Sequence, residues 1–90
     1  MTILDDAVVA YVWRPSSSIP GKHPDAVSDP ALRARVEEII AELDAIRPGA
    51  DAADLMPWAD REARAVAAGH PELGEPGIKA LRDLLSWTWR

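Results

Sequence analysis

The clearest pattern in the chain is a stripe of apolar residues between positions 30 and 47. Apolar side chains recur there at alternating spacings of four and three residues, which places them on one face of an α-helix: Leu32, Val36, Ile39, Leu43 and Ile46. Asp29 is a suitable N-cap because Pro30 can occupy the first helical position without losing a hydrogen bond. Pro48 and Gly49 mark the end of the helix. We expect this helix to organise the core.

Two further helices are expected in the second half of the chain. Residues 55–68 are rich in alanine, begin after the candidate cap Asp54 and end at Gly69. Small side chains dominate the apolar face of this segment, so it can approach a neighbour closely but buries little area: Leu55, Ala59, Ala63 and Val66. Residues 76–90 carry apolar side chains spaced by three, four and four positions: Ile78, Leu81, Leu85 and Trp89.

The first apolar segment, residues 7–13, is rich in β-branched and aromatic residues and fits either a strand or a helix. Signals before it favour a helix, because Thr2 and Asp5 resemble a capping arrangement. Asp5 and Asp6 also occupy the first turn, where the helix dipole favours acidic groups. The alternative is a short pairing of this segment with a strand at residues 86–90, which would give an α+β fold.

A long polar connection, residues 16–28, follows the first segment. It is longer than the usual link between two helices, so we expect it to be functional or to be held on the surface by Ile19 and Val27.

Within this connection, His23-Pro24-Asp25 precedes an amphipathic helix and resembles the signature loop of the J-domain co-chaperones. In that family the tripeptide follows a long basic helix, whereas Pro15, Pro20 and Gly21 interrupt the chain here. We therefore expect His23-Pro24-Asp25 to form a turn, because proline and aspartate are common turn residues.

Composition supports one globular unit. With 48% hydrophobic and 28% charged residues, the 90-residue chain is close to the average for folded domains. The prediction is therefore all-α: a single small helical domain over residues 1–90, a bundle of three to four helices with a long polar loop after the first segment. The longest apolar run, residues 7–13, is too short to span a membrane, and no signal-peptide pattern precedes it. We expect a soluble, cytoplasmic protein with no membrane contact.

Catalytic and cofactor signatures do not emerge from the residue types. The chain contains no cysteine, which excludes disulfides, thiolate metal sites and a cysteine nucleophile. His23 and His70 are far apart in the sequence, and no ligand pair shares a helix face. Gly21-Lys22 lacks the glycine and hydroxyl residues of a phosphate-binding loop. We predict no catalytic residues, no metal and no cofactor, and hence no enzyme.

The four tryptophans are the most informative residues, because the chain has no phenylalanine and tryptophan is enriched at protein interfaces. On a helix, Trp87 and Trp89 lie about 200° apart, so if Trp89 joins the core then Trp87 points outward. The predicted partner-binding residues are three tryptophans and two residues on the charged outer face of the helix at 30–47: Trp13, Trp58, Trp87, Arg33 and Glu37.

The predicted function is therefore non-catalytic protein–protein interaction, with another protein or with a second copy of the chain as partner. The alanine-, arginine- and aspartate-rich composition favours a bacterial or phage accessory or adaptor protein. The alternative is a helix-turn-helix-like DNA-binding regulator or antitoxin-type module, using Arg61 and Arg64 or Lys79 and Arg82. A net charge of -5 makes nucleic acid an unfavourable partner.

Overall fold

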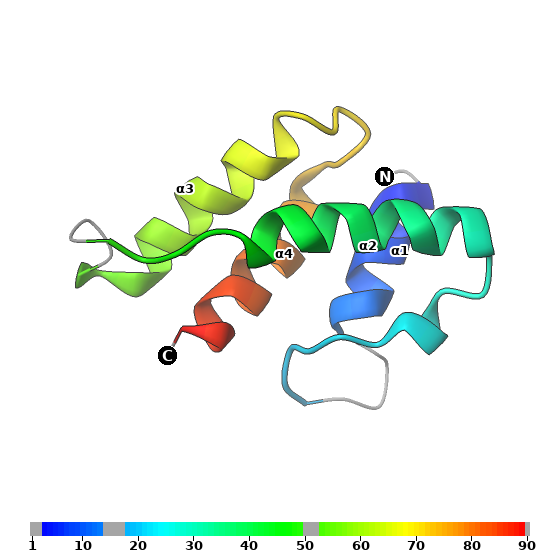
Figure 1. The fold of residues 1–90 in the computed structure, drawn as a ribbon, viewed down its shortest axis with the longest axis horizontal. Coiled ribbons are helices and arrows are strands. Elements are labelled where there is room, and N and C mark those ends of the chain that lie inside the picture. Colours follow the sequence, from blue (N-terminus) through cyan, green and yellow to red (C-terminus); the bar gives the residue numbers. More distant parts are fainter. Residues whose placement is uncertain (1–2, 14–17, 50–52, 90) are drawn as a thin grey trace.

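Four α-helices make up most of the computed structural model, which describes residues 3–13, 18–49 and 53–89 (Figure 1). A single turn of 3-10 helix, η1, precedes the second α-helix. The bounds are α1 Ile3–Val12, η1 Pro24–Ala26, α2 Pro30–Asp44, α3 Leu55–Ala67 and α4 Glu75–Thr88. No strand occurs in these described segments, so the all-α prediction is confirmed and the terminal two-stranded pairing is wrong.

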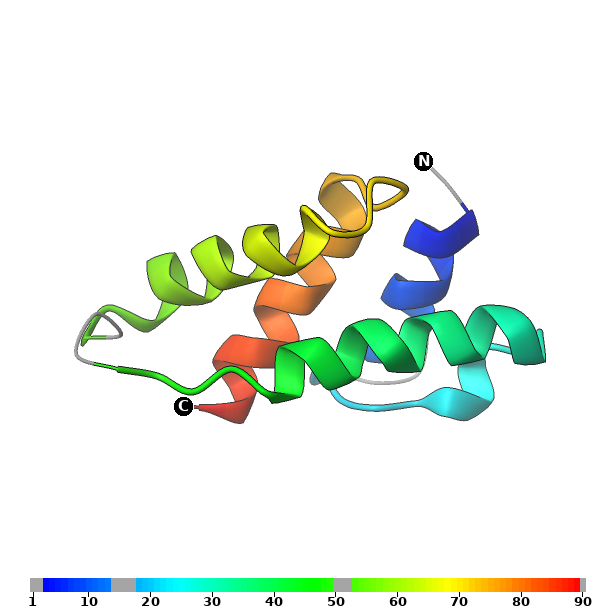
Figure 2. The same cartoon turned by 45° about the horizontal axis from the view of Figure 1, so that its top comes forward.

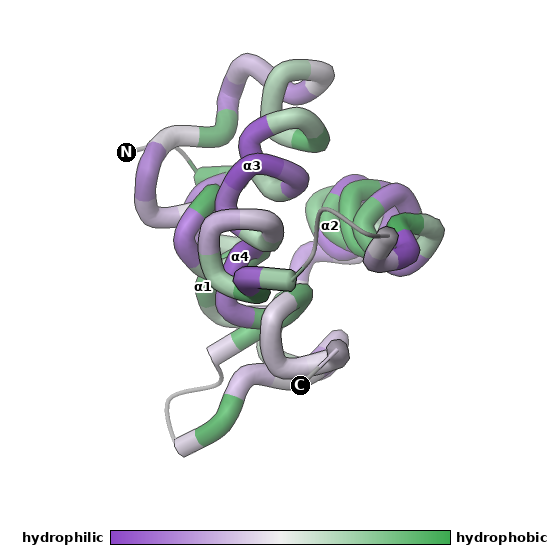
Figure 3. Tube along the Cα trace, turned by 90° about the vertical axis from the view of Figure 1, so that its left-hand side faces the viewer, coloured by the Kyte–Doolittle hydropathy of each residue, from purple (hydrophilic) through white to green (hydrophobic). Residues whose placement is uncertain are grey.

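Helix α4 lies between α1 and α3, and α2 crosses one face of the layer that these three helices form (Figures 1 and 2). Figure 3, seen from the side, shows α2 on one side of the other three helices. The expectation that the helix at 30–47 organises the core is therefore wrong, because α4 makes the most extensive contacts. Buried Gly77 and Ala80 let its neighbours approach, and the buried leucines of α4 fill the centre: Leu81, Leu84 and Leu85.

Helix α1 forms although its sequence suits a strand, because helical spacing lets one face of it enter the core. Leu4, Val8 and Tyr11 are buried on that face, and Val12 joins them. Burial against α4 outweighs the weak β-propensity of this segment. Thr2, the expected capping residue, lies outside the described residues.

The two predicted helix caps differ in the structure. Asp29 caps α2 as predicted: its Oδ1 accepts hydrogen bonds from the backbone N–H groups of Ala31 and Leu32, at 2.9 and 3.3 Å. Asp54 occupies the N-cap position of α3, but its side chain makes no capping hydrogen bond. The sequence therefore predicted the N-cap position correctly in both helices. The capping hydrogen bond forms only at Asp29.

The connection after α1 returns along the end of that helix. Gly21 N–H donates to Val12 O at 3.0 Å, and His23 N–H donates to Tyr11 O at 2.9 Å. Val27 is buried as expected, whereas Ile19 is 49% exposed, so of these two residues Val27 anchors the connection in the core. His23-Pro24-Asp25 forms the turn predicted for it, with Pro24 starting η1.

Asp5 joins the first and last helices. Its carboxylate is 1% exposed and accepts hydrogen bonds from the N–H groups of Gly74, at 2.9 and 3.0 Å, and Gly77, at 3.0 Å. These amides begin α4, where backbone donors have no partner within the helix and the dipole favours a negative charge. The sequence suggested that Asp5 acts on its own helix; instead it caps α4. A Cβ atom at Gly77 would overlap this carboxylate, which explains the glycine.

Candidate functional site

Exposed apolar side chains gather at one place on the surface. Among the described residues, four large hydrophobic side chains are markedly exposed, namely Ile3, Ile19, Met56 and Trp87. All of these except Ile3 line a single groove with a volume of about 440 Å³. We call it the Trp13–Trp87 groove, after the two tryptophans in its lining.

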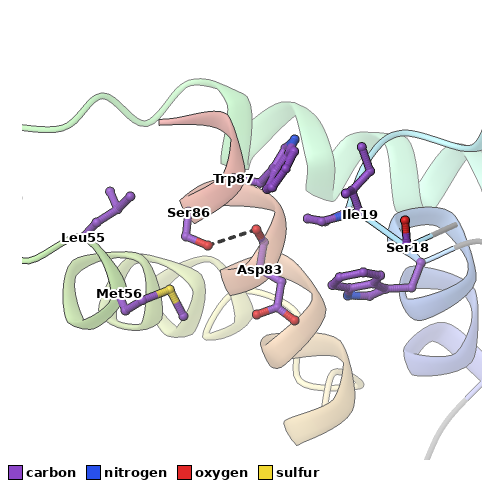
Figure 4. Close-up of a pocket in the computed structure, with 9 residues that line it drawn as sticks. Ser18, Ile19, Leu55, Met56, Asp83, Ser86 and Trp87 are labelled. Carbon is purple, nitrogen blue, oxygen red and sulfur yellow. Dashed lines mark hydrogen bonds between the residues drawn. The ribbon is translucent and has the colours of Figure 1, made fainter. Parts of the chain in front are cut away.

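Helix α4 forms the floor of this groove. Asp83, Ser86 and Trp87 are spaced by three and four positions, so they share the face of α4 that points away from its buried leucines. Figure 4 shows the three side chains between the walls of the groove.

Two walls rise on either side of the floor, and the segments that build them are far apart in the sequence. One consists of Leu55 and Met56, at the start of α3. The other consists of Trp13, directly after α1, together with residues 18–20 of the following connection. Ser18 and Ile19 lie across from Leu55 and Met56 in Figure 4. The groove therefore depends on α1 and α3 being held on opposite sides of α4.

The polar groups in the groove are few. The Asp83 carboxylate accepts from Nε and Nη2 of Arg82 at 3.2 and 3.0 Å, and the Ser86 hydroxyl donates to the Asp83 carbonyl at 3.0 Å. The remaining lining is mostly apolar, with the hydroxyl of Ser18 at the edge. Two hydroxyls and one carboxylate, without an imidazole or amine in the lining, suit binding of an apolar group better than acid–base chemistry.

A second depression of about 320 Å³ adjoins the groove, because Trp13 and Asp83 line both. It continues along the same face of α4 toward its N-terminus, where Pro76 and Lys79 contribute to the lining. The face of α4 opposite its buried residues thus carries an apolar end at Trp87 and a cationic end at Lys79.

The structure brings together two of the five residues predicted to bind a partner. Trp13 and Trp87 both line the groove. Trp58 is 2% exposed and belongs to the core, so its assignment as a surface contact is wrong. The reason is visible in the sequence, since Trp58 lies three positions after Leu55 and shares its helix face. Arg33 and Glu37 lie on α2 and do not line the groove.

The predicted separation of the two C-terminal tryptophans is confirmed. Trp87 is 38% exposed, whereas Trp89 is half-buried and packs against the core. The guanidinium of Arg47 lies over the Trp89 ring, 5.5 Å from its centroid, which is a cation–π arrangement. Trp89 therefore closes the end of the molecule where α2 and α4 meet.

Sequence reasoning missed several groove residues. Asp83 and Ser86 precede the predicted residue Trp87 by four positions and one position, so the α4 residues of the groove could have been found from helical spacing. Ile19 was expected to anchor the connection, and Met56 carried no signal of its own. These two side chains become part of one site only through the tertiary arrangement of α1, α3 and α4.

Outside the groove, ion pairs connect neighbouring elements on the surface. Arg64 pairs with Glu75 at 2.9 Å and with Asp60 at 3.0 Å, linking α3 to the start of α4. Hydrogen bonds and charge attraction from Arg64 lower the pKa of Glu75, and Glu75 and Asp60 raise the pKa of Arg64. Two further contacts join α2 to the turn between α3 and α4: an ion pair of Arg35 with Glu72 at 2.6 Å, and a hydrogen bond between Nε2 of His70 and the Glu42 carboxylate at 2.7 Å.

Two other kinds of site are absent from the described residues, namely a metal-binding cluster and a membrane-spanning helix. No three histidine or acidic side chains there come close enough to hold a metal ion. No helix in the described segments has the length and apolar character needed to cross a membrane. Comparison of the chain with protein-family models, curated proteins and solved structures finds no match. The case for a function therefore rests on the groove.

Proposed function

We propose that this protein is a non-catalytic protein-binding module whose Trp13–Trp87 groove receives apolar side chains of a partner protein. The supporting observation is that Ile19, Met56 and Trp87, all exposed, line one groove. Folded proteins seldom expose several large apolar side chains in one patch unless the patch binds something. Tryptophan is also the side chain most enriched among residues that dominate binding energy. The composition-based expectation of a cytoplasmic bacterial or phage protein stays a prediction.

DNA binding is the competing function, and the ion pairs disfavour it. A helix-turn-helix module would need the cations of α3 and α4 to reach phosphates. Glu75 and Asp60 already hold Arg64, and Asp83 holds Arg82. The link between α3 and α4 also runs from Ala68 to Gly74, which is longer than the tight turn of about 3–4 residues in that motif.

A peptide selection tests the proposal. A display library of random peptides about 14 residues long, enough for roughly four helical turns, is selected on the purified protein. We expect bound peptides to carry a large apolar residue and to lose at least about ten-fold in affinity on Trp87→Ser. Ile3→Ser is the matched control, because it removes an apolar side chain that is 75% exposed and outside the groove.

The two classes of function give opposite results. Peptides that bind wild type and Ile3→Ser equally but fail on Trp87→Ser support the proposal. Peptides unaffected by Trp87→Ser would show that the groove is not the binding site. Micromolar, salt-sensitive binding of duplex DNA by the wild-type chain would instead support the regulator class.

A further inference from the structure

The size of the Trp13–Trp87 groove limits what can occupy it. Nine residues line the groove, whereas a stable interface between two globular proteins uses about 20–30 residues on each side. A second folded copy of the chain would need far more surface than the groove offers. A short segment of a partner, inserting one or two apolar side chains, matches this size.

The charge at the other end of the face restricts the chemistry of that segment. Lys79 is exposed and lines the depression that adjoins the groove. The other charged groups around it pair with one another: Arg82 with Asp83, and Arg64 with Glu75 and Asp60. Among the described residues, no carboxylate lies within ion-pair distance of the Lys79 ammonium. Lys79 is therefore an exposed ammonium beside an apolar groove, without an ion pair of its own to a described carboxylate.

The spacing of these two features is fixed by α4. Lys79 and Trp87 are eight positions apart, and at a helical rise of about 1.5 Å per residue they are separated by about 12 Å along the axis. Eight positions turn the helix through two turns and about 80°, so Lys79 and Trp87 lie on neighbouring parts of the α4 surface, in depressions that share Asp83 and Trp13. A partner segment laid along α4 can reach both at once.

We infer that the occupant is a short partner segment that places an apolar side chain in the Trp13–Trp87 groove and a carboxylate against Lys79. Lys79 and Trp87 are about 12 Å apart along the axis of α4, which corresponds to about eight residues of a helix or about four residues of an extended chain. This inference rests on the proposed function and adds the identity of the recognised chemistry. An acidic group selects and orients the segment, while the apolar side chain supplies most of the affinity.

Charge reversal tests the inference. A synthetic peptide from the selection described above is titrated into the wild type and into Lys79→Glu. We expect Lys79→Glu to weaken binding about three- to ten-fold, since an exposed attraction becomes a repulsion. A peptide whose acidic residue is replaced by lysine should recover that loss on Lys79→Glu and bind the wild type more weakly. Raising the salt concentration should shrink both differences.

Arg61→Glu is the matched control, because it makes the same change of charge at an exposed position of α3 that lines neither depression. It should leave peptide affinity nearly unchanged. Sedimentation of the chain alone completes the experiment and should show a monomer.

The possible failures are distinct. Peptides that depend on Trp87 but bind Lys79→Glu as well as the wild type would overturn the carboxylate inference and leave the proposed function standing. The absence of any peptide that depends on Trp87 would overturn both. A dimer of the chain alone that Trp87→Ser dissociates would show that the occupant is a second copy and not a short segment.

Discussion

The carboxylate of Asp5 is a single side chain on which two helices depend. It is buried, and its hydrogen bonds come from the N–H groups of Gly74 and Gly77 at the start of α4. Buried donors that lose their acceptor keep the full cost of desolvation. Asp5 therefore stabilises the contact between α1 and α4 through hydrogen bonds to two backbone N–H groups as well as through packing.

We expect Asp5→Ala to lower the free energy of unfolding by at least about 3 kcal/mol, because it leaves amides without acceptors and opens a gap. Urea titration followed by circular dichroism measures this loss. Asp6→Ala is the control, since Asp6 is the adjacent exposed acid on the same helix. Its effect should stay within about 0.5 kcal/mol. Equal losses in the two variants would show that Asp5 does not cap α4.

The phenol of Tyr11 gives a second prediction at the scale of one residue. Burial raises its pKa above the ordinary value, and the negative charge of Glu37 raises it further. The folded state therefore holds this proton more tightly than the unfolded state. The associated stability is complete below the unfolded pKa of about 10 and is lost as pH rises through the folded pKa.

Tyr11 is the only tyrosine in the chain, so tyrosinate absorbance reports it alone. The midpoint of titration should be higher in the folded protein than in urea, and Glu37→Gln should move it down. Identical midpoints in the folded and unfolded protein would contradict the burial of the ring.

At the scale of elements, the sequence predicted which segments are helices, but it did not predict which helices pack against each other. The apolar spacing of residues 30–47 and 76–90 matches α2 and α4 to within a few residues. Periodicity shows which face of a helix is buried, but it does not show which helix covers that face. This is why α2, with the longest stripe, was expected at the centre that α4 occupies.

Capping offers a prediction at this scale, because two aspartates occupy the same position of two helices. Asp29→Ala should destabilise the protein by about 1 kcal/mol, since Asp29 accepts hydrogen bonds from Ala31 and Leu32. Asp54→Ala should cost only a few tenths, since the Asp54 side chain makes no capping hydrogen bond. Thermal unfolding monitored by circular dichroism compares the two. A larger loss for Asp54→Ala would reverse the assignment of the cap.

At the scale of the whole molecule, the candidate site was only partly predictable. Trp13 and Trp87 were singled out by residue type and helical phase, and both line the groove. Ile19 and Met56 were not, because their meeting depends on the placement of α1 and α3 around α4. A binding surface assembled from segments this far apart leaves no spacing pattern in the sequence.

Trp58 is buried in the core, whereas Trp87 is exposed in the groove, and one variant of each separates a role in folding from the proposed role in binding. Trp58→Ala should cost about 3–5 kcal/mol, a large share of the stability of so small a domain. Trp87→Ala should leave the thermal midpoint within a few degrees of the wild type, because the ring is 38% exposed. Loss of the fold on Trp87→Ala would make the groove a part of the core.

The bond between Asp5 and α4 also bears on how the chain is made. Asp5 is synthesised well before its donors Gly74 and Gly77, which follow 69 and 72 positions later. Until those residues are present, the Asp5 carboxylate lacks these donors, and the apolar face of α1 lacks the helix α4 that covers it. The contact between α1 and α4 can therefore form only after Gly74 and Gly77 have been synthesised. The long-range packing of α1 against α4 should make folding slower than in a bundle whose helices pair only with their neighbours in sequence.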